Sequence, residues 1–122
     1  ARDERMRAAL AVLPKTLCHG DPNRANVLGT ALVDWGNARV APAGLDLAVL
    51  AAQGPVDLAA YRAEFSALPE PLALVEREWA LVQAHVQYLG FAADHLGSDR
   101  VAEMTGTATA ALDRLGPALD AL

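Results

Sequence analysis

The sequence contains very little cysteine, and it contains no long apolar run. A single cysteine, Cys18, excludes a disulfide within the chain and suits a reducing compartment, so we expect a cytoplasmic location. No apolar run approaches the roughly 20 residues that span a bilayer, and the N-terminus lacks the apolar core of a signal peptide. A net charge of −5 argues against nucleic acids and anionic membranes as partners, because phosphate binding needs clustered Lys and Arg.

The rest of the composition is typical of a packed globular protein. Hydrophobic residues make up 53% of the chain and charged residues 20%. Apolar residues three and four positions apart predict a long helix over 72–96, a further helix that follows Ser98 as its N-cap, and shorter helices over 3–12 and 56–67. We find no internal repeat, so we expect a single domain over 1–122 that is mainly α with a small β-hairpin in its N-terminal third.

Polar residues gather in one stretch, residues 16–36, where the helical pattern is interrupted by short runs of β-favouring residues. Asp21 is followed directly by proline, which is typical of a type I turn because proline presets its backbone φ angle. The turn shortens the distance between Asp21 and Asn26, so both side chains can address one small volume.

A β-hairpin is indicated where Gly29-Thr30 lies between two apolar runs. A two-residue loop would pair Asn26 with Val33 and would turn Asp34 to the opposite face. A three-residue loop with a bulge would instead pair Asn26 with Asp34. We favour the second register, because it places two oxygen ligands side by side. An amide oxygen and a carboxylate suit Mg²⁺ better than zinc, and Asp21 then remains available to a substrate.

In their order along the chain, these motifs resemble a known family. The segments His-Gly-Asp-Pro-Asn-Arg-Ala-Asn (19–26) and Val-Asp-Trp-Gly (33–36), followed by Gly-Leu-Asp-Leu-Ala (44–48), resemble the catalytic and metal loops of aminoglycoside phosphotransferases and choline kinases. The resemblance covers residues 16–50 closely. It implies a protein-kinase-like fold, of which this chain would be the C-terminal catalytic lobe, with the helical part over 44–122 on the substrate side.

The resemblance also implies roles for individual residues. Asp21 would orient or deprotonate the acceptor hydroxyl, and Asn26 and Asp34 would bind Mg²⁺ that bridges the phosphates of ATP. His19 would brace the catalytic loop, and Asp46 would hydrogen-bond its backbone. The helices would line the acceptor pocket, where the candidates for substrate contact are His85 and Tyr88.

Two parts of a complete kinase are missing from the sequence. It has no Gly-x-Gly segment to cover phosphates, and its only lysine, Lys15, lies four residues before His19. We therefore expect a longer protein whose N-terminal lobe completes the nucleotide site, and a chain that is inactive alone. The alternative is a non-catalytic binding module or pseudokinase that keeps the loop for its structure. The acceptor is not evident from the sequence, although the overall acidity mildly favours a cationic one.

Overall fold

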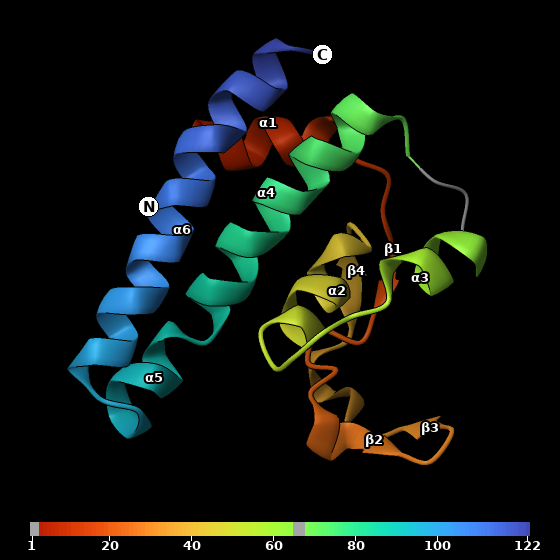
Figure 1. Ribbon diagram of the computed structural model, residues 1–122, viewed down its shortest axis with the longest axis vertical. Coiled ribbons are helices and arrows are strands. Elements are labelled where there is room, and N and C mark those ends of the chain that lie inside the picture. The colour runs from red at the N-terminus through yellow and green to blue at the C-terminus, as the bar shows by residue number, and fades with distance from the viewer. Residues whose placement is uncertain (1–2, 65–67) are drawn as a thin grey trace.

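The computed structural model describes residues 3–64 and 68–122, and it is mainly helical (Figure 1). Its helices are α1 (Glu4–Val12), α2 (Gly44–Ala51), α3 (Leu58–Glu64), α4 (Glu70–Gln87), α5 (Leu89–His95) and α6 (Ser98–Asp120). Between α1 and α2 the chain forms the strands β1 (Thr16–Cys18), β2 (Val27–Leu28), β3 (Ala31–Leu32) and β4 (Arg39–Ala41), and the single 3-10 turns η1 (Arg24–Asn26) and η2 (Trp35–Asn37). The prediction of a mainly helical fold is confirmed.

The two longest helices, α4 and α6, lie side by side and form the body of the molecule (Figure 1). The helix α1 crosses them at one end, α5 packs at the other, and α2 packs against α4. Small buried residues such as Ala80, Ala84 and Ala111 allow the helix backbones to approach closely. Larger apolar side chains such as Leu45 and Leu115 fill the remaining core.

A buried ion pair also joins α4 to α6. The carboxylate of Glu78 is 2% exposed; its Oε2 accepts a hydrogen bond from Arg114 Nε at 3.0 Å and forms an ion pair with Nη2 at 2.9 Å. The guanidinium remains about half exposed, so it brings a charge to the carboxylate without being buried itself. Its hydrogen bond to Glu78 raises the pKa of Arg114. The pair fixes the two long helices relative to each other.

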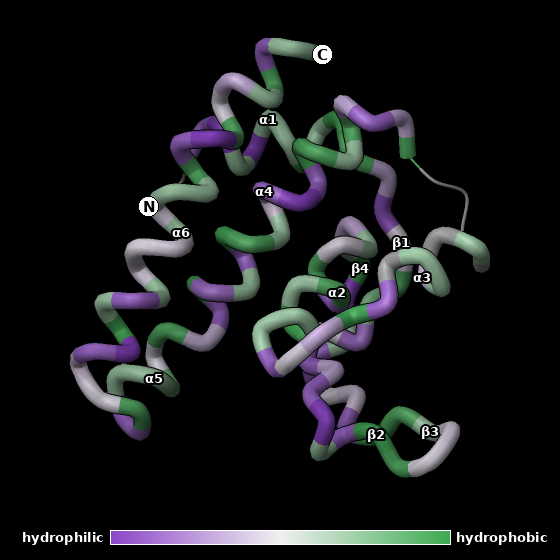
Figure 2. The backbone as a smooth tube through the Cα atoms, viewed as in Figure 1, coloured by the Kyte–Doolittle hydropathy of each residue, from purple (hydrophilic) through white to green (hydrophobic). Residues whose placement is uncertain are grey.

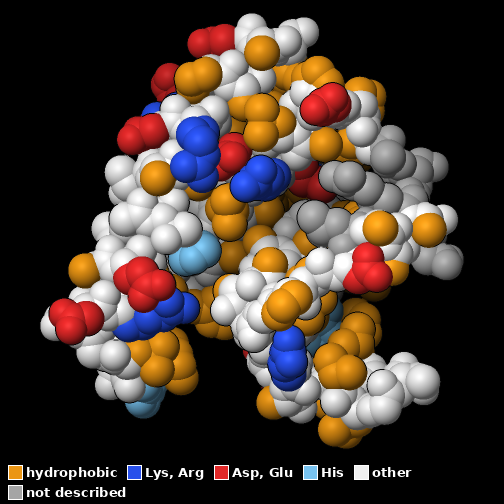
Figure 3. Space-filling view, viewed as in Figure 1, with side chains coloured by type: hydrophobic (Ala, Val, Ile, Leu, Met, Phe, Trp, Pro, Cys, Tyr) orange, Lys and Arg blue, Asp and Glu red, His pale blue; other side chains and the backbone are white. Residues whose placement is uncertain are grey.

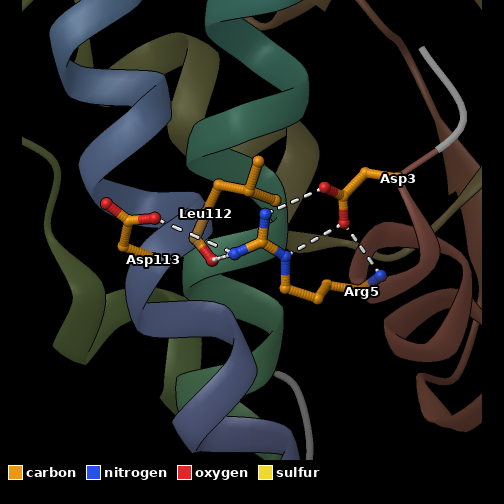
Figure 4. A network of polar contacts seen from close by, with 4 residues as sticks. All are labelled: Asp3, Arg5, Leu112 and Asp113. Carbon is orange, nitrogen blue, oxygen red and sulfur yellow. Dashed lines mark hydrogen bonds and ion pairs between the residues drawn. The ribbon is translucent and has the colours of Figure 1, made fainter.

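The helix α1 is held by a second polar network (Figure 4). Asp3 is its N-cap and accepts from the backbone N–H of Arg5 at 2.8 Å. The Arg5 side chain pairs with the same carboxylate, which lowers the pKa of Asp3, and donates through Nη1 to the carbonyl of Leu112 on α6 at 3.1 Å. This arginine therefore ties the first helix to the last.

The strands form two small antiparallel sheets, where the sequence predicted only a hairpin. The hairpin is β2–β3, which projects from the body and is apolar along its strands (Figures 1 and 2). The second sheet pairs β1 with β4, with Leu17 opposite Val40. The strand β4 is only three residues long and ends at Ala41, directly before Pro42, so its pattern is too short to be detected in the sequence.

The long predicted helix over 72–96 is divided in the structure. It breaks at Tyr88, whose φ of −98° and ψ of 3° leave the helical region. Gly90, a poor helix former two residues later, weakens the helical continuation at this point. The final helix begins one residue earlier than predicted, because Gly97, with a φ of 88°, takes the N-cap position that we assigned to Ser98.

The segment predicted as a helix over 56–67 contains α3, and its last three residues lie outside the described part of the chain. The helix α6 continues through Gly116 and Pro117 to Asp120. In the described ranges, no helix is both long enough and apolar enough to cross a membrane.

Candidate active site

The loop after β1 is held by a carboxylate from α2. Asp46 accepts the backbone N–H of His19 through Oδ2 at 2.7 Å and that of Gly20 through Oδ1 at 2.9 Å. His19 and Gly20 are both buried, so without this carboxylate their N–H groups would lose their partners away from water. Asp46 thereby determines where the loop leaves the strand.

The imidazole of His19 braces the loop from within. Its Nδ1 accepts the backbone N–H of Asp21 at 3.2 Å, and its Nε2 lies 2.7 Å from the carbonyl oxygen of Val33. Since one nitrogen must accept and the other must donate, the neutral ring carries its proton on Nε2. The ring is 2% exposed and its centroid is 4.7 Å from that of Trp35. His19 thus connects the start of the loop to the end of the hairpin.

Asp21 has one oxygen engaged and one available. Its Oδ1 accepts from the hydroxyl of Tyr88 and from Nδ2 of Asn23, the latter at 3.1 Å. Within the described residues, Oδ2 accepts no hydrogen bond. Burial, together with the hydrogen bond to Asp21, raises the pKa of Tyr88, so the phenol stays protonated and continues to donate. The carboxylate is therefore oriented with Oδ2 as its free acceptor.

The hairpin adopts the register that we did not favour. Val27 pairs with Leu32, and the backbone N–H of Val33 donates to the carbonyl of Asn26 at 2.9 Å, so the loop has two residues. The reason is Gly29, whose φ of 61° supplies the positive angle that a tight hairpin turn needs at its first central position. The prediction that Asn26 pairs with Asp34 is wrong.

The two predicted metal ligands are nevertheless positioned by distinct local features. Asn26 is 9% exposed and donates its amide N–H to the carbonyl of Asp21 at 2.9 Å, which leaves Oδ1 as the atom that can face a cation. Asp34 is exposed and adopts a left-handed conformation with φ 60° and ψ 67°. It is the one non-glycine residue with a positive φ in the described ranges. Such backbone strain is often found at functional sites.

This donor set suits Mg²⁺. Asn26 Oδ1 and the Asp34 carboxylate are hard oxygen ligands, and Mg²⁺ usually takes one or two protein ligands and completes its shell with water and phosphate oxygens. Among the described side chains, no three or more of His, Cys, Asp or Glu are grouped as a metal site.

Three residues that the sequence did not single out support the loop from neighbouring elements. Gln87, at the end of α4, donates to the carbonyl of Gly20 at 2.7 Å and accepts from Arg39 of β4. Gln53, after α2, accepts the backbone N–H of Arg24 at 2.8 Å. Their partners are 29 to 67 residues away in sequence, so no local pattern could have identified them.

A cavity of about 520 Å³ opens beside Asp21, and we name it the Asp21 cavity. Asp21 and Asn23 line it from the loop, and Val49, Ala52 and Gln53 line it from α2 and the residues after it. The opposite wall comes from the ends of α4, α5 and α6: Ala84, His85, Tyr88, Phe91, Leu96, Arg100 and Met104. Figure 3 shows hydrophobic side chains around a hollow between these two parts of the molecule.

Both predicted substrate-contact residues, His85 and Tyr88, line this cavity together with Asp21. His85 Nδ1 lies 2.7 Å from the carbonyl of Leu81 and must therefore donate to it, so in the neutral ring Nε2 is an acceptor. Tyr88 is committed to Asp21 through its hydroxyl, so it supports the carboxylate as well as lining the cavity.

The neighbouring Cys18 has a different environment. Its side chain is 1% exposed, with Sγ 3.5 Å from the carbonyl oxygens of Ala41 and Pro42. Burial, with the nearby charge of Asp46, raises its pKa to about 11. The thiol is therefore neutral near pH 7 and serves as a packed core group, not as a nucleophile.

A comparison with models of known protein families finds a match for this chain. The model of the phosphotransferase enzyme family matches residues 1–85, more than half of the chain. The matched range contains the loop from His19 to Asn26, the hairpin, Asp34 and Asp46. No curated protein and no solved structure matches the chain. On the extent of the family match, the chain belongs to the phosphotransferase enzyme family.

Proposed function

We propose that this chain is the catalytic part of an ATP-dependent phosphotransferase that transfers the γ-phosphate to a hydroxyl group of a small molecule. The observation that carries the proposal is the environment of Asp21. One of its carboxylate oxygens is held by Tyr88 and Asn23, the other is free, and the side chain lines a cavity of about 520 Å³. Cavities of this size are typical of small-molecule sites.

In this proposal Asp21 acts on the acceptor hydroxyl. The hydroxyl donates its hydrogen bond to Oδ2, and its oxygen attacks the γ-phosphorus of ATP. The bond from that phosphorus to the bridging oxygen breaks, ADP leaves with the electron pair, and the hydroxyl proton passes to Asp21. Because the transition state of phosphoryl transfer is loose, orienting the hydroxyl matters more than a strong base. His19 and Asp46 contribute by holding the loop that carries Asp21.

Asn26 and Asp34 would hold Mg²⁺ in this enzyme. Both offer oxygen ligands, and the amide nitrogen of Asn26 is already committed to the Asp21 carbonyl. When bound, Mg²⁺ supplies positive charge that offsets the charge of the transferring phosphates. The left-handed backbone of Asp34 and its exposed side chain leave the carboxylate accessible to a nucleotide.

We also propose that the chain is the C-terminal lobe of a protein-kinase-like enzyme, and that an N-terminal lobe of the same protein holds the other side of the nucleotide. Lys15 is unsuited to a phosphate-binding role, because its ammonium donates to the carbonyls of Leu10 at 2.6 Å and Leu13 at 3.3 Å at the end of α1. The projecting hairpin exposes apolar side chains, including Leu28 at 61%, that a further lobe would cover.

The test uses the complete protein with its N-terminal lobe. We expect Asp21→Asn to abolish turnover and to leave nucleotide affinity largely intact, and Asp34→Ala to weaken binding of Mg-ATP. Asp120→Asn, at the exposed end of α6, is the control for loss of one carboxylate charge. Unimpaired turnover with Asp21→Asn would refute the assignment.

A calorimetric titration with Mg-ATP separates the enzyme from the non-catalytic alternative. The proposal requires the complete protein to bind Mg-ATP, and this chain alone to bind it much more weakly. A complete protein that binds no nucleotide would instead support a helical binding module that keeps the Asp21 loop for its structure.

A further inference from the structure

Two consecutive residues at the end of α4 contact two consecutive residues of the loop that carries Asp21. Gln87 donates from Nε2 to the carbonyl of Gly20 at 2.7 Å, and the hydroxyl of Tyr88 donates to Oδ1 of Asp21. Successive side chains of a regular α-helix point about 100° apart, whereas here both reach the same loop. The helix α4 ends at Gln87, and the backbone leaves the helical region at Tyr88. The break in the long predicted helix therefore lies where its side chains meet the loop.

The side-chain amide of Gln87 has only one orientation that satisfies its neighbours. Its Oε1 accepts from the guanidinium of Arg39 on β4, which can only donate, and its Nε2 faces the Gly20 carbonyl, which can only accept. The reversed amide would set donor against donor and acceptor against acceptor, so Arg39 determines which end of the amide meets Gly20. The backbone N–H of Gly20 is held by Asp46. The residue directly before Asp21 is therefore hydrogen-bonded on both sides, from α2 and from α4.

The hydroxyl of Tyr88 has one proton, and that proton is committed to Asp21. Burial, together with the hydrogen bond to Asp21, raises the pKa of Tyr88, so the phenol keeps this proton at physiological pH. The same oxygen of Asp21 also accepts from Asn23, but Asn23 lies two residues away on the same loop. In the described ranges, Tyr88 is the hydrogen-bond partner that reaches this carboxylate from outside the loop. It therefore fixes the carboxylate relative to the helices of the cavity wall.

We propose that Gln87 and Tyr88 together are positioning residues for the Asp21 carboxylate, and we call this pair the α4 clamp. Gln87 sets the loop backbone at Gly20, and Tyr88 holds Oδ1, so that Oδ2 is presented to the Asp21 cavity. The hydroxyl of Tyr88 thus acts through Asp21 and not by binding the substrate. That Oδ2 then meets a reacting hydroxyl rests on the proposed function, whereas the positioning itself does not.

Tyrosine labelled with ¹³C at the ζ carbon tests the α4 clamp by NMR in this chain without any turnover, because this carbon carries the hydroxyl. The chain has two tyrosines, Tyr88 and Tyr61, and Tyr61 on α3 lies outside the lining of the Asp21 cavity. We expect Asp21→Asn to shift the Tyr88 signal, since a neutral amide replaces the carboxylate that accepts its hydrogen bond, and to leave the Tyr61 signal in place.

A change at Gln87 should reach the same signal through the loop. Gln87→Glu keeps an oxygen for Arg39 but removes the N–H that the Gly20 carbonyl accepts, so we expect it to shift the Tyr88 signal. Gln83→Glu makes the same change one turn earlier on α4, outside the lining of the cavity, and should not shift it.

The complete protein with its N-terminal lobe provides the kinetic test. Hydrolysis of Mg-ATP uses water as the acceptor, so the assay needs no knowledge of the alcohol. The water oxygen attacks the γ-phosphorus, the bond from that phosphorus to the bridging oxygen breaks, and ADP leaves with the electron pair. The water proton passes to Asp21 and then to solvent, so the same carboxylate has to be oriented as for an alcohol.

We expect Tyr88→Phe and Gln87→Glu each to lower the kcat of hydrolysis about tenfold or more, because a misplaced catalytic group slows the reaction. The KM for Mg-ATP should change by less than about twofold, since the α4 clamp does not touch the nucleotide. The stoichiometry of Mg-ATP binding by calorimetry counts the folded sites, so a loss of folded protein is not mistaken for a loss of kcat. Tyr61→Phe and Gln83→Glu are the matched controls and should leave kcat and KM within about twofold of the wild type.

The inference is overturned if the Tyr88 signal stays in place in Asp21→Asn, or if Tyr88→Phe or Gln87→Glu keeps the wild-type kcat. A raised KM with unchanged kcat in Tyr88→Phe would make Tyr88 a nucleotide-binding residue and would overturn it as well. If the wild-type complete protein shows no hydrolysis, the Tyr88 signals alone decide the inference. If it also binds no Mg-ATP, the proposed function is refuted, and a Tyr88 signal that responds to Asp21→Asn and Gln87→Glu leaves the positioning standing.

Discussion

Removal of the Asp46 carboxylate should destabilise the chain by about 3 kcal/mol. Both of its oxygens accept backbone N–H groups, from His19 at 2.7 Å and from Gly20 at 2.9 Å. A hydrogen bond to a charged group contributes about 1.5–3 kcal/mol. Because Asp46 is only partly buried, we take the lower end of that range for each bond, so Asp46→Ala should cost about 3 kcal/mol. This is a large fraction of the 5–15 kcal/mol that stabilises a typical domain.

The conservative variant separates the two bonds. An asparagine at position 46 keeps one acceptor oxygen but presents N–H donors to the second backbone N–H, so we expect Asp46→Asn to lose about half as much stability as Asp46→Ala. Asp120→Ala removes a carboxylate at an exposed position of α6 and should change stability by less than about 0.5 kcal/mol.

The measurement is urea denaturation followed by far-UV circular dichroism, with amide hydrogen exchange as a local readout. The exchange of the His19 and Gly20 amides should accelerate in Asp46→Ala more than the loss of global stability requires. The reasoning is refuted if Asp46→Ala unfolds within about 0.5 kcal/mol of the wild type and those two amides remain protected.

Three further predictions concern single side chains. Gly20→Ala should lower the free energy of unfolding by about 3 kcal/mol or more, because Gly20 has a φ of 87° and a Cβ there would lie 2.2 Å from a carbonyl oxygen of η2. Gly29 has a φ of 61° and open space around it, so Gly29→Ala should lower the free energy of unfolding by only about 1 kcal/mol, and urea denaturation measures both. The pKa of Cys18 is raised from 9.0 to about 11, so the folded chain keeps the thiol proton at pH values where the unfolded chain loses it. The free energy of unfolding should therefore fall as the pH rises between those values, and it should fall less in Cys18→Ala. Arg114→Ala leaves the buried carboxylate of Glu78 without its charge partner and should lower the free energy of unfolding by about 2–3 kcal/mol. Adding Glu78→Gln should recover part of that loss, and a double-mutant cycle measures the coupling between the two residues.

The helical part of this fold follows from local patterns that are visible in the sequence. Apolar residues spaced by three and four predict α4 and α6, and Asp3 is the N-cap of α1 at the start of the helix predicted over 3–12. The break at Tyr88 was not predicted, since its neighbours continue the apolar spacing. A glycine two residues later was the available signal, and Gly90 alone does not distinguish a break from a tolerated helical glycine.

The register of the β2–β3 hairpin follows the local turn signal, and not the register that would suit a metal site. Gly29 before Thr30 is the sequence of a tight two-residue turn, and the structure has that turn. A longer loop would have placed Asn26 beside Asp34 as two metal ligands, but it disregards this turn signal. In the actual arrangement Val33 donates its backbone N–H to the carbonyl of Asn26, and Asp34 follows in a left-handed conformation. Aspartate enters this region more readily than most non-glycine residues, but that preference alone does not predict it at one position.

The candidate site was predictable as far as its residues are close in sequence. His19, Asp21 and Asn26 lie on one loop, and their spacing carries the resemblance. The wall that faces Asp21 comes from the ends of α4, α5 and α6, which are brought together by helix packing, and it includes Arg100, which no motif marks. Motif and cavity are thus determined by different parts of the chain, so a reaction type can be inferred from the loop while the ligand has to be inferred from the helices.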